Sequence, residues 1–228
     1  MKKEINKKPP AFIAMIIFTI TVLLFNGSCS KDTKGQDPGN TTTGSSKIVY
    51  KDVIPDSVIH GSYNLDLNDD GITDFAFNIS SNRSVCGGDA LFGYYYRDIT
   101  KLSVTPANEN NEVITDGTYA LALDSSSAIV SDSLWATASQ TLIYGALNSS
   151  GRCTIFPYGV AGHWINVSDK YLGLKFIKDN NTYYGRARLS SSYHIITGSN
   201  HLSIGQLILK DYAFNSVPNQ HILAGQTK

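Results

Sequence analysis

Short runs of β-forming residues recur from Lys47 to the C-terminus and constrain the fold of this chain more than any other feature. Tyr, Phe, Val, Ile and Thr dominate these runs, and Gly, Asn, Asp and Ser separate them at intervals of about 8–12 residues. No window shows the sustained 3.6-residue periodicity of an amphipathic helix. Because all-β domains of roughly 200 residues often form one unit, residues 47–228 are predicted to fold as a single, jelly-roll-like β-sandwich.

Alternation of apolar and polar residues places the expected strands along the whole of this domain. The clearest hairpin joins Tyr171–Ile177 to Thr182–Leu189. In its second arm Tyr184, Arg186 and Arg188 share one face. The other expected strands are Tyr63–Asp66, Phe75–Ile79, Ala90–Arg97, Lys101–Thr105, Thr118–Leu123, Thr141–Leu147, Cys153–Phe156, Leu202–Phe214 and a short one in Ile222–Gly225.

The first 28 residues have the composition of a signal peptide. A lysine-rich start precedes the uncharged run Ala11–Phe25, which is shorter than the roughly 20 residues of a membrane-spanning helix. The segment Asn26–Cys29 resembles a bacterial lipoprotein cleavage box, although Asn26 stands where an apolar residue is usual. Cleavage there would leave Cys29 as a lipidated N-terminus that anchors the chain. The alternatives are an ordinary secretory signal and an uncleaved anchor helix.

The segment that follows lacks any large apolar residue and is expected to be a flexible tether. The predicted organisation is therefore a signal peptide in 1–28, the lipidated Cys29 with a linker in 29–46, and the β domain in 47–228. The start Ser30-Lys31-Asp32 resembles the export signals of surface lipoproteins in Bacteroidota. This resemblance implies an outer-membrane lipoprotein at the cell surface or on the periplasmic face.

The charge balance argues against nucleic acid as a partner. The chain has 19 basic and 19 acidic residues. Residues 1–28 hold four lysines and Glu4, so the chain from Cys29 onward has 15 basic against 18 acidic residues, a net charge of −3. No basic stripe interleaves with aromatic residues. The lipid anchor is the expected contact with the membrane.

Two cysteines remain once Cys29 is set aside. Cys86 and Cys153 form an even pair in a chain expected to enter an oxidising compartment, which favours a disulfide over two buried free thiols. In the chain-entropy model such a bridge stabilises by about 3–5 kcal/mol. No cysteine or histidine spacing typical of a zinc site occurs.

One stretch, Asp66 to Asp74, has the spacing of a calcium-binding loop. Oxygen-bearing side chains stand at its positions one, three, five and nine, and glycine stands at position six. The alternative is a metal-free Asp-Gly hairpin turn. A structural ion held at about 0.1–1 mM affinity is expected. The predicted ligands are Asp66, Asn68, Asp70, the Ile72 carbonyl and Asp74.

This loop resembles the calcium turns of FG-GAP repeats and other exported calcium modules. An EF-hand is a poorer match, because Phe77 stands at position twelve, where an EF-hand has a bidentate glutamate. The flanking segments also read as strands, whereas an EF-hand has helices there.

Several patches from about Asp116 onward resemble a group of exported β-proteins of Bacteroidota. The resemblance implies a β-sandwich and no particular activity. The chain departs from the group at Arg186, where tryptophan is frequent. The patches are Gly162–Trp164, Tyr171–Phe176, Tyr184–Leu189, Asp211–Asn215, Pro218 and Ile222–Gly225.

Catalytic motifs are scarce, and no catalytic residue is assigned. The only glutamates after Cys29 are Glu109 and Glu112, and neither G-x-S-x-G nor H-E-x-x-H occurs. A glycan-degrading hydrolase would need two carboxylates across a cleft, to which Asp89 or Asp98 could contribute. The sequence leaves enzymatic activity open and gives it little support.

Aromatic and arginine side chains favour a binding role instead. Trp164, Tyr184, Arg186 and Arg188 are candidate ligand-binding residues, since aromatic rings stack on sugars and arginines grip acidic groups. The alternatives are that the rings fill the core and the arginines form a solvated strand face. The predicted function is binding or adhesion at the cell envelope, with a glycan as a candidate ligand. A glycan-degrading hydrolase and a purely structural envelope component are the alternatives.

Overall fold

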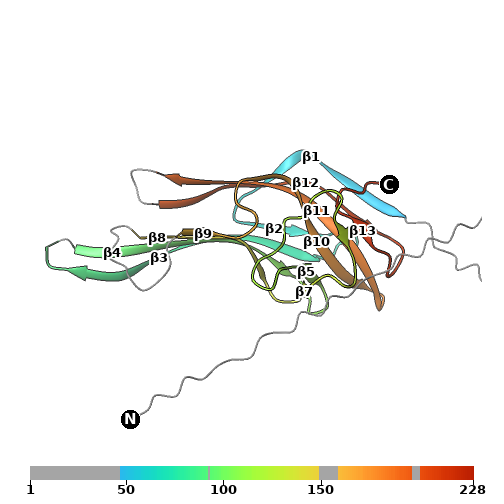
Figure 1. The fold of residues 1–228 in the computed structure, drawn as a ribbon, viewed down its shortest axis with the longest axis horizontal. Coiled ribbons are helices and arrows are strands. Elements are labelled where there is room, and N and C mark those ends of the chain that lie inside the picture. The colour runs from blue at the N-terminus through green and yellow to red at the C-terminus, as the bar shows by residue number, and fades with distance from the viewer. Residues whose placement is uncertain (1–46, 92, 149–158, 197–200) are drawn as a thin grey trace, which may run out of the picture. The chain divides into compact units, whose positions relative to one another are not determined.

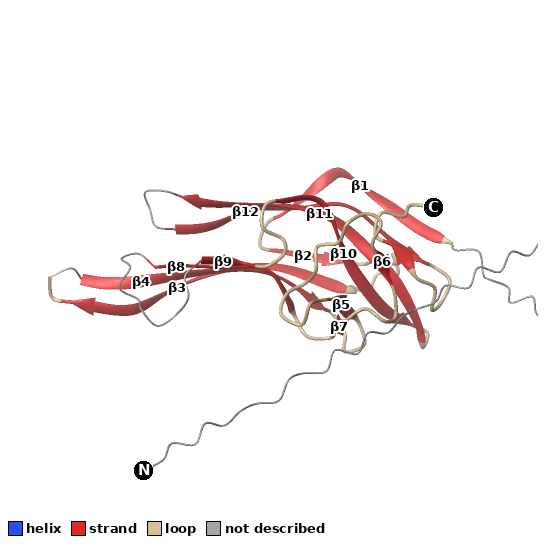
Figure 2. Ribbon diagram, viewed as in Figure 1, coloured by secondary structure: helices blue, strands red, loops and turns tan. Residues whose placement is uncertain are grey.

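The computed structural model describes residues 47–91, 93–148, 159–196 and 201–228, and these form an all-β sandwich (Figures 1 and 2). Two large antiparallel sheets and a small two-stranded sheet contain all the strands in these ranges. The described residues belong to one compact unit. Within them no helix is long and apolar enough to cross a membrane.

The first large sheet has six strands in the order β1-β12-β11-β10-β5-β7. The first strand along the chain therefore pairs with the last long one, and Ile48 lies opposite Asn215. The bounds are β1 Ile48–Ile59, β5 Glu112–Ile114, β7 Trp135–Ala136, β10 Val167–Lys178, β11 Asn181–Ile196 and β12 His201–Asn215.

The second large sheet has five strands in the order β2-β3-β4-β8-β9. Its bounds are β2 Ser62–Leu65, β3 Phe75–Asp89, β4 Gly93–Pro106, β8 Gln140–Asn148 and β9 Gly159–Ala161. The small sheet pairs β6 (Ala128–Ile129) with β13 (Ile222–Leu223).

The hydrophobic core lies between the two large sheets. Because side chains of a strand alternate between its two faces, Phe75 and Phe77 at the start of β3 and Leu174 and Phe176 of β10 enter this core. The rings of Phe176 in β10 and Phe214 in β12 meet edge to face, with their centroids 5.4 Å apart. Each fully buried side chain of this kind stabilises the fold by about 1.5–3 kcal/mol.

A second, smaller apolar cluster covers the opposite face of the six-stranded sheet. Tyr184 of β11 and Ala213 of β12 pack there against Ile129, Ile222 and Ala224. These last three come from the β6–β13 pair and the residues after it. Part of the outer face of this sheet is therefore covered by chain that precedes β7 or follows β12.

The predicted fold class is confirmed, and so are most of the expected strands. The predicted hairpin Tyr171–Leu189 is β10 and β11, joined at Asp179 and Asn180, which both have positive φ as a tight two-residue turn requires. The two strands expected at Ala90–Arg97 and Lys101–Thr105 form one continuous strand, β4, which begins at Gly93. Cys153–Phe156 lies outside the described residues.

One expected strand is wrong, and one long strand was not expected. Thr118–Leu123 forms only isolated bridges, among them Tyr119 with Thr141 and Leu123 with Tyr171. The unexpected strand is β1, which is long and which the alternation of apolar and polar residues did not indicate. Its sequence interrupts the apolar positions with Lys51, Asp52 and Pro55, because most of this edge strand is exposed.

Candidate functional site

The predicted calcium loop connects β2 to β3, as expected from its flanking residues. Asp66 organises the turn, because its carboxylate accepts hydrogen bonds from the amides of Asp70 (3.2 Å) and Gly71 (2.7 Å). Gly71 has a φ of 85°, a conformation that glycine adopts without strain. The Asp70 carboxylate accepts a further hydrogen bond from the Ile72 amide at 3.0 Å.

The last predicted ligand of the loop, Asp74, is buried, with 5% of its surface exposed. Its Oδ2 accepts a hydrogen bond from the Leu67 amide at 2.8 Å, and Asn111 donates to its backbone carbonyl at 3.1 Å. Burial raises the pKa of the Asp74 carboxyl, and the negative charges of Asp70 and Asp66 raise that pKa further. The three carboxylates thus lie close enough to repel one another.

Asn68 carries a buried polar atom without a partner. Its Oδ1 is inaccessible to solvent and accepts no hydrogen bond from the described part of the chain. Leaving a buried acceptor unpaired costs about 1–3 kcal/mol. Asn68 occupies position three of the loop, so this oxygen is one of the predicted calcium ligands.

Two lysines from other strands neutralise part of the loop's charge. Lys51 of β1 binds Asp69 at 2.5 Å, and Lys178 at the end of β10 lies 3.2 Å from Asp70. Burial raises the pKa of the Asp70 carboxyl, but the hydrogen bond from the Ile72 amide and the charge of Lys178 lower it. The net shift of this pKa is downward. The sequence motif gave no sign of these lysines, because β1 and β10 belong to the other sheet and approach the loop only in the folded sandwich.

The loop places all the predicted ligands along one turn, but their side chains do not form a metal cage. Among the described residues no group of three Asp, Glu, His or Cys side chains converges at metal-binding distance. Asp66 and Asp74 instead accept hydrogen bonds from amides of the loop itself. This arrangement fits a metal-free turn as well as a loop that reorganises around a cation.

Three of the four predicted ligand-binding residues are buried, which corrects the expectation that they form an exposed surface. Trp164 is 0% exposed and donates a hydrogen bond from its indole nitrogen to the Ala120 carbonyl at 3.1 Å. Tyr184 and Arg186 are 6% and 1% exposed. They lie on the predicted face of β11, but the β6–β13 region covers that face. Only Arg188 keeps a partly exposed side chain, at 30%.

Arg186 is the centre of a buried ionic cluster. Its guanidinium forms an ion pair with Asp211 of β12 and donates a hydrogen bond to the Gln226 carbonyl at 3.1 Å. The rings of Tyr50 and Tyr171 lie over it, with centroids 5.4 and 5.3 Å away. These contacts assign Arg186 to the architecture of the domain.

The cluster continues outward along the same face. Arg188 binds the other Asp211 oxygen at 2.5 Å and approaches Asp169 at 3.2 Å. Asp169 also pairs with Lys210 at 2.8 Å. Three cations therefore share two carboxylates, and the charges are largely satisfied within the protein.

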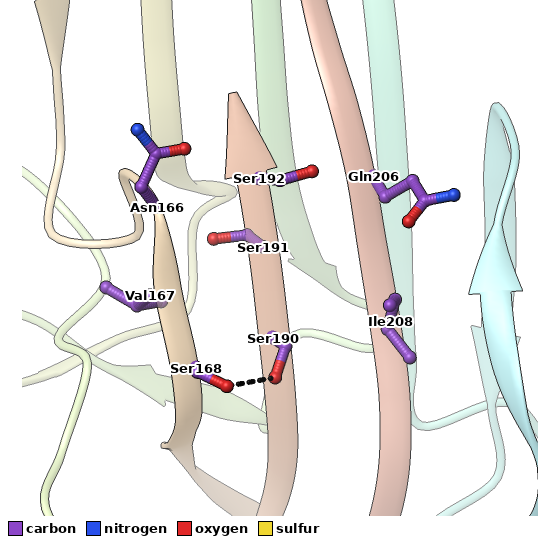
Figure 3. A pocket seen from close by; sticks show the side chains of 8 residues that line it. All are labelled: Asn166, Val167, Ser168, Ser190, Ser191, Ser192, Gln206 and Ile208. Atoms are coloured by element: carbon purple, nitrogen blue, oxygen red, sulfur yellow. Dashed lines mark hydrogen bonds between the residues drawn. The ribbon is translucent and has the colours of Figure 1, made fainter. Parts of the chain in front are cut away.

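Beyond this cluster the face is hollowed into a polar pocket of about 340 Å³ (Figure 3). It lies across the adjacent strands β10, β11 and β12, where Ser190 and Ser192 face the same side as Arg188. The sequence did not single out this pocket. Its only signal was the run Ser190-Ser191-Ser192, which does not indicate which hydroxyls face outward.

The two acidic residues considered for catalysis are engaged elsewhere. Asp98 is buried and receives two hydrogen bonds from Arg83, at 2.7 and 2.8 Å. Asp89 accepts hydrogen bonds from the Tyr95 hydroxyl and from the Leu91 amide. The described contacts therefore do not present them as a carboxylate pair across a cleft.

Other predicted sites fall partly or wholly outside the described residues. Cys86 is disulfide-bonded, whereas Cys153, its predicted partner, lies in the range that is not described. Cys29 and the predicted signal peptide also lie outside.

Comparison of the chain with protein-family models, curated proteins and solved structures found no match. The resemblances noted in the sequence therefore stay predictions.

Proposed function

We propose that this chain is a lipid-anchored protein of the cell envelope that works as a binding or adhesion module, with a glycan as its ligand and one calcium ion as a structural cofactor. The observation that carries its calcium part is the Oδ1 of Asn68, which is buried without a partner among the described residues, in a loop with three acidic side chains at calcium-ligand spacing. The signal-like N-terminus and Cys29 support the anchor.

Calcium fits the electrostatics of this loop. Asp66, Asp70 and Asp74 repel one another, and Lys178 offsets only part of that charge. A hard divalent cation would take oxygen ligands from these side chains and from Asn68, whose Oδ1 would then be satisfied. The bound ion would fix the β2–β3 connection and so stabilise the sandwich.

Binding is preferred over hydrolysis because the acidic side chains near the tyrosine run already have partners. Arg83 holds Asp98, and Tyr95 donates to Asp89. A hydrolase of the glycosidase type would need two carboxylates that reach the substrate.

The test of the calcium site is thermal unfolding of the full chain in detergent, first with EDTA and then with 10 mM calcium. At a dissociation constant of about 0.1–1 mM, saturation stabilises the fold by about 1.4–2.7 kcal/mol. For a domain of this size that raises Tm by about 3–10 °C. Asp70→Ala, which removes a ligand oxygen, should abolish the shift, whereas Asp132→Ala, at an exposed position elsewhere, should preserve it. Equal Tm values in EDTA and calcium would refute the site.

A further inference from the structure

The polar pocket lies on the face of the six-stranded sheet that points away from the sandwich core. Leu189 of β11 and Leu207 and Leu209 of β12 are buried in the core. Their neighbours Ser190 and Ile208 therefore project to the opposite side, where they line the pocket (Figure 3). The pocket is thus built on three paired strands rather than on loops.

Hydrogen bonds within the protein hold one side of the pocket in place. The Ser190 hydroxyl accepts a hydrogen bond from the Asp169 amide at 3.0 Å and lies 3.5 Å from the Ser168 hydroxyl. The Asn166 Oδ1 accepts a hydrogen bond from the Tyr193 amide at 2.7 Å, which orients its NH₂ group. These side chains keep their positions before any ligand arrives, which lowers the entropy cost of binding.

The other side of the pocket offers polar groups that have no hydrogen-bond partner among the described residues. Within the described part of the chain, no hydrogen bond engages the Ser192 hydroxyl, the Gln206 amide or the Asn166 NH₂ group. Together these groups can both donate and accept hydrogen bonds. Ser192 lies in β11, Gln206 in β12 and Asn166 directly before β10, and all three line one hollow.

The chemistry of the lining selects a class of ligand. No lining side chain is charged, and Val167 and Ile208 add apolar surface among the hydroxyls and amides. Sugar rings have the matching character, because their hydroxyls donate and accept while their C–H faces are apolar. The volume of about 340 Å³ is at the lower end of the range of about 300–1,000 Å³ for small-molecule sites, which suits a small saccharide unit.

The charged side chains next to the pocket do not favour a charged ligand, because they already pair with one another. Arg188 and Lys210 both pair with Asp169, and Arg188 also pairs with Asp211. An extended peptide is a poorer match as well, because peptides that pair with a sheet add to its edge, whereas this pocket lies on its face.

We infer that this pocket binds a neutral saccharide through Asn166, Ser192 and Gln206. The inference rests on the binding role proposed above, and it places that role at a site that does not include Trp164, Tyr184 or Arg186.

The test is isothermal titration of the full chain, in micelles of a sugar-free detergent, against neutral oligosaccharides of hexoses and pentoses. Oligosaccharides of uronic acids serve as the charged comparison. Ser192→Leu fills the pocket, and Gln206→Ala removes hydrogen-bonding groups without adding bulk. Each should weaken neutral-saccharide binding by about tenfold or more, as expected for the loss of one or two hydrogen bonds. Ser80→Leu, an exposed strand position on the other sheet, is the matched control and should bind as the wild type does.

Each outcome bears on a different claim. Neutral-saccharide binding that is lost in both pocket variants and kept in Ser80→Leu supports the inference. Saccharide binding that neither pocket variant weakens overturns the pocket as the site and leaves the binding role standing. Binding of uronic acids alone overturns the neutral class. If no saccharide of either kind binds the wild type, both the pocket and the glycan-binding role are refuted.

Discussion

Substituting the members of the buried ionic cluster, Arg186, Asp211 and Arg188, should reduce the free energy of unfolding by unequal amounts. Asp211→Asn leaves the Arg186 guanidinium, 1% exposed, without a carboxylate. Arg186→Met leaves Asp211 with Arg188 as its remaining partner, at 2.5 Å. Arg188→Met removes a side chain that is 30% exposed and keeps the buried pair intact. The cost should therefore fall in the order Asp211→Asn, Arg186→Met, Arg188→Met.

The size of each loss in the free energy of unfolding depends on how deeply the affected charge is buried. Removing one partner of a buried pair costs about 3–5 kcal/mol, because the other charge is left uncompensated. We expect Asp211→Asn near the upper end and Arg186→Met near the lower end of that range. Arg188→Met should cost about 1 kcal/mol, as for a partly exposed ion pair. The Arg186→Met/Asp211→Asn double variant should cost less than the sum of its singles, since the two sites are coupled.

Urea unfolding followed by tryptophan fluorescence measures these differences. The variants are comparable only if their m-values agree, because a changed m-value indicates a different denatured or native state. If Asp211→Asn costs no more than Arg188→Met, the account of Arg186 as a buried charge held by Asp211 is wrong.

Two further predictions concern local structure. The Tyr119 amide, His163 and the Thr118 amide lower the pKa of Asp116 to about 2, so its stabilising contribution should be complete above its ordinary pKa of 3.8 and lost as the pH falls from 4 to 2. Urea titrations across that window should show a smaller loss in Asp116→Asn than in the wild type, and equal losses would contradict the assignment. Gly162 has a φ of 116°, and a Cβ there would lie 2.0 Å from the Leu142 carbonyl oxygen. Gly162→Ala should therefore cost about 3 kcal/mol or more in the same assay, whereas Gly61→Ala, with positive φ and open space, should cost about 1 kcal/mol. Equal costs would show that the collision is relieved by a small backbone shift.

Local patterns in the sequence predicted the parts of this fold that depend on neighbours along the chain. The β10–β11 hairpin follows from alternation on both sides of Asp179 and Asn180, residues that tolerate positive φ. Alternation also placed Tyr184 and Arg186 on one face of β11 correctly. It could not show whether that face meets water.

The missing information was long-range. The β6–β13 pair lies far in the sequence from β11, yet it covers Tyr184, and the Gln226 carbonyl binds Arg186. The same limit applies to the acidic loop, whose oxygens could be counted from the sequence. The lysines that partly neutralise it come from β1 and β10 of the other sheet and become its neighbours only in the folded sandwich.

The pairing of β1 with β12 has a consequence for the order in which this domain forms. During synthesis β1 emerges before all of the other described strands, but its hydrogen-bonding partner comes from residues 201–215. The six-stranded sheet cannot close until almost the whole domain has left the ribosome, and such non-local pairing is slow. A domain that closes late in synthesis stays unfolded for longer, and the export proposed for this chain would require an unfolded state at the membrane.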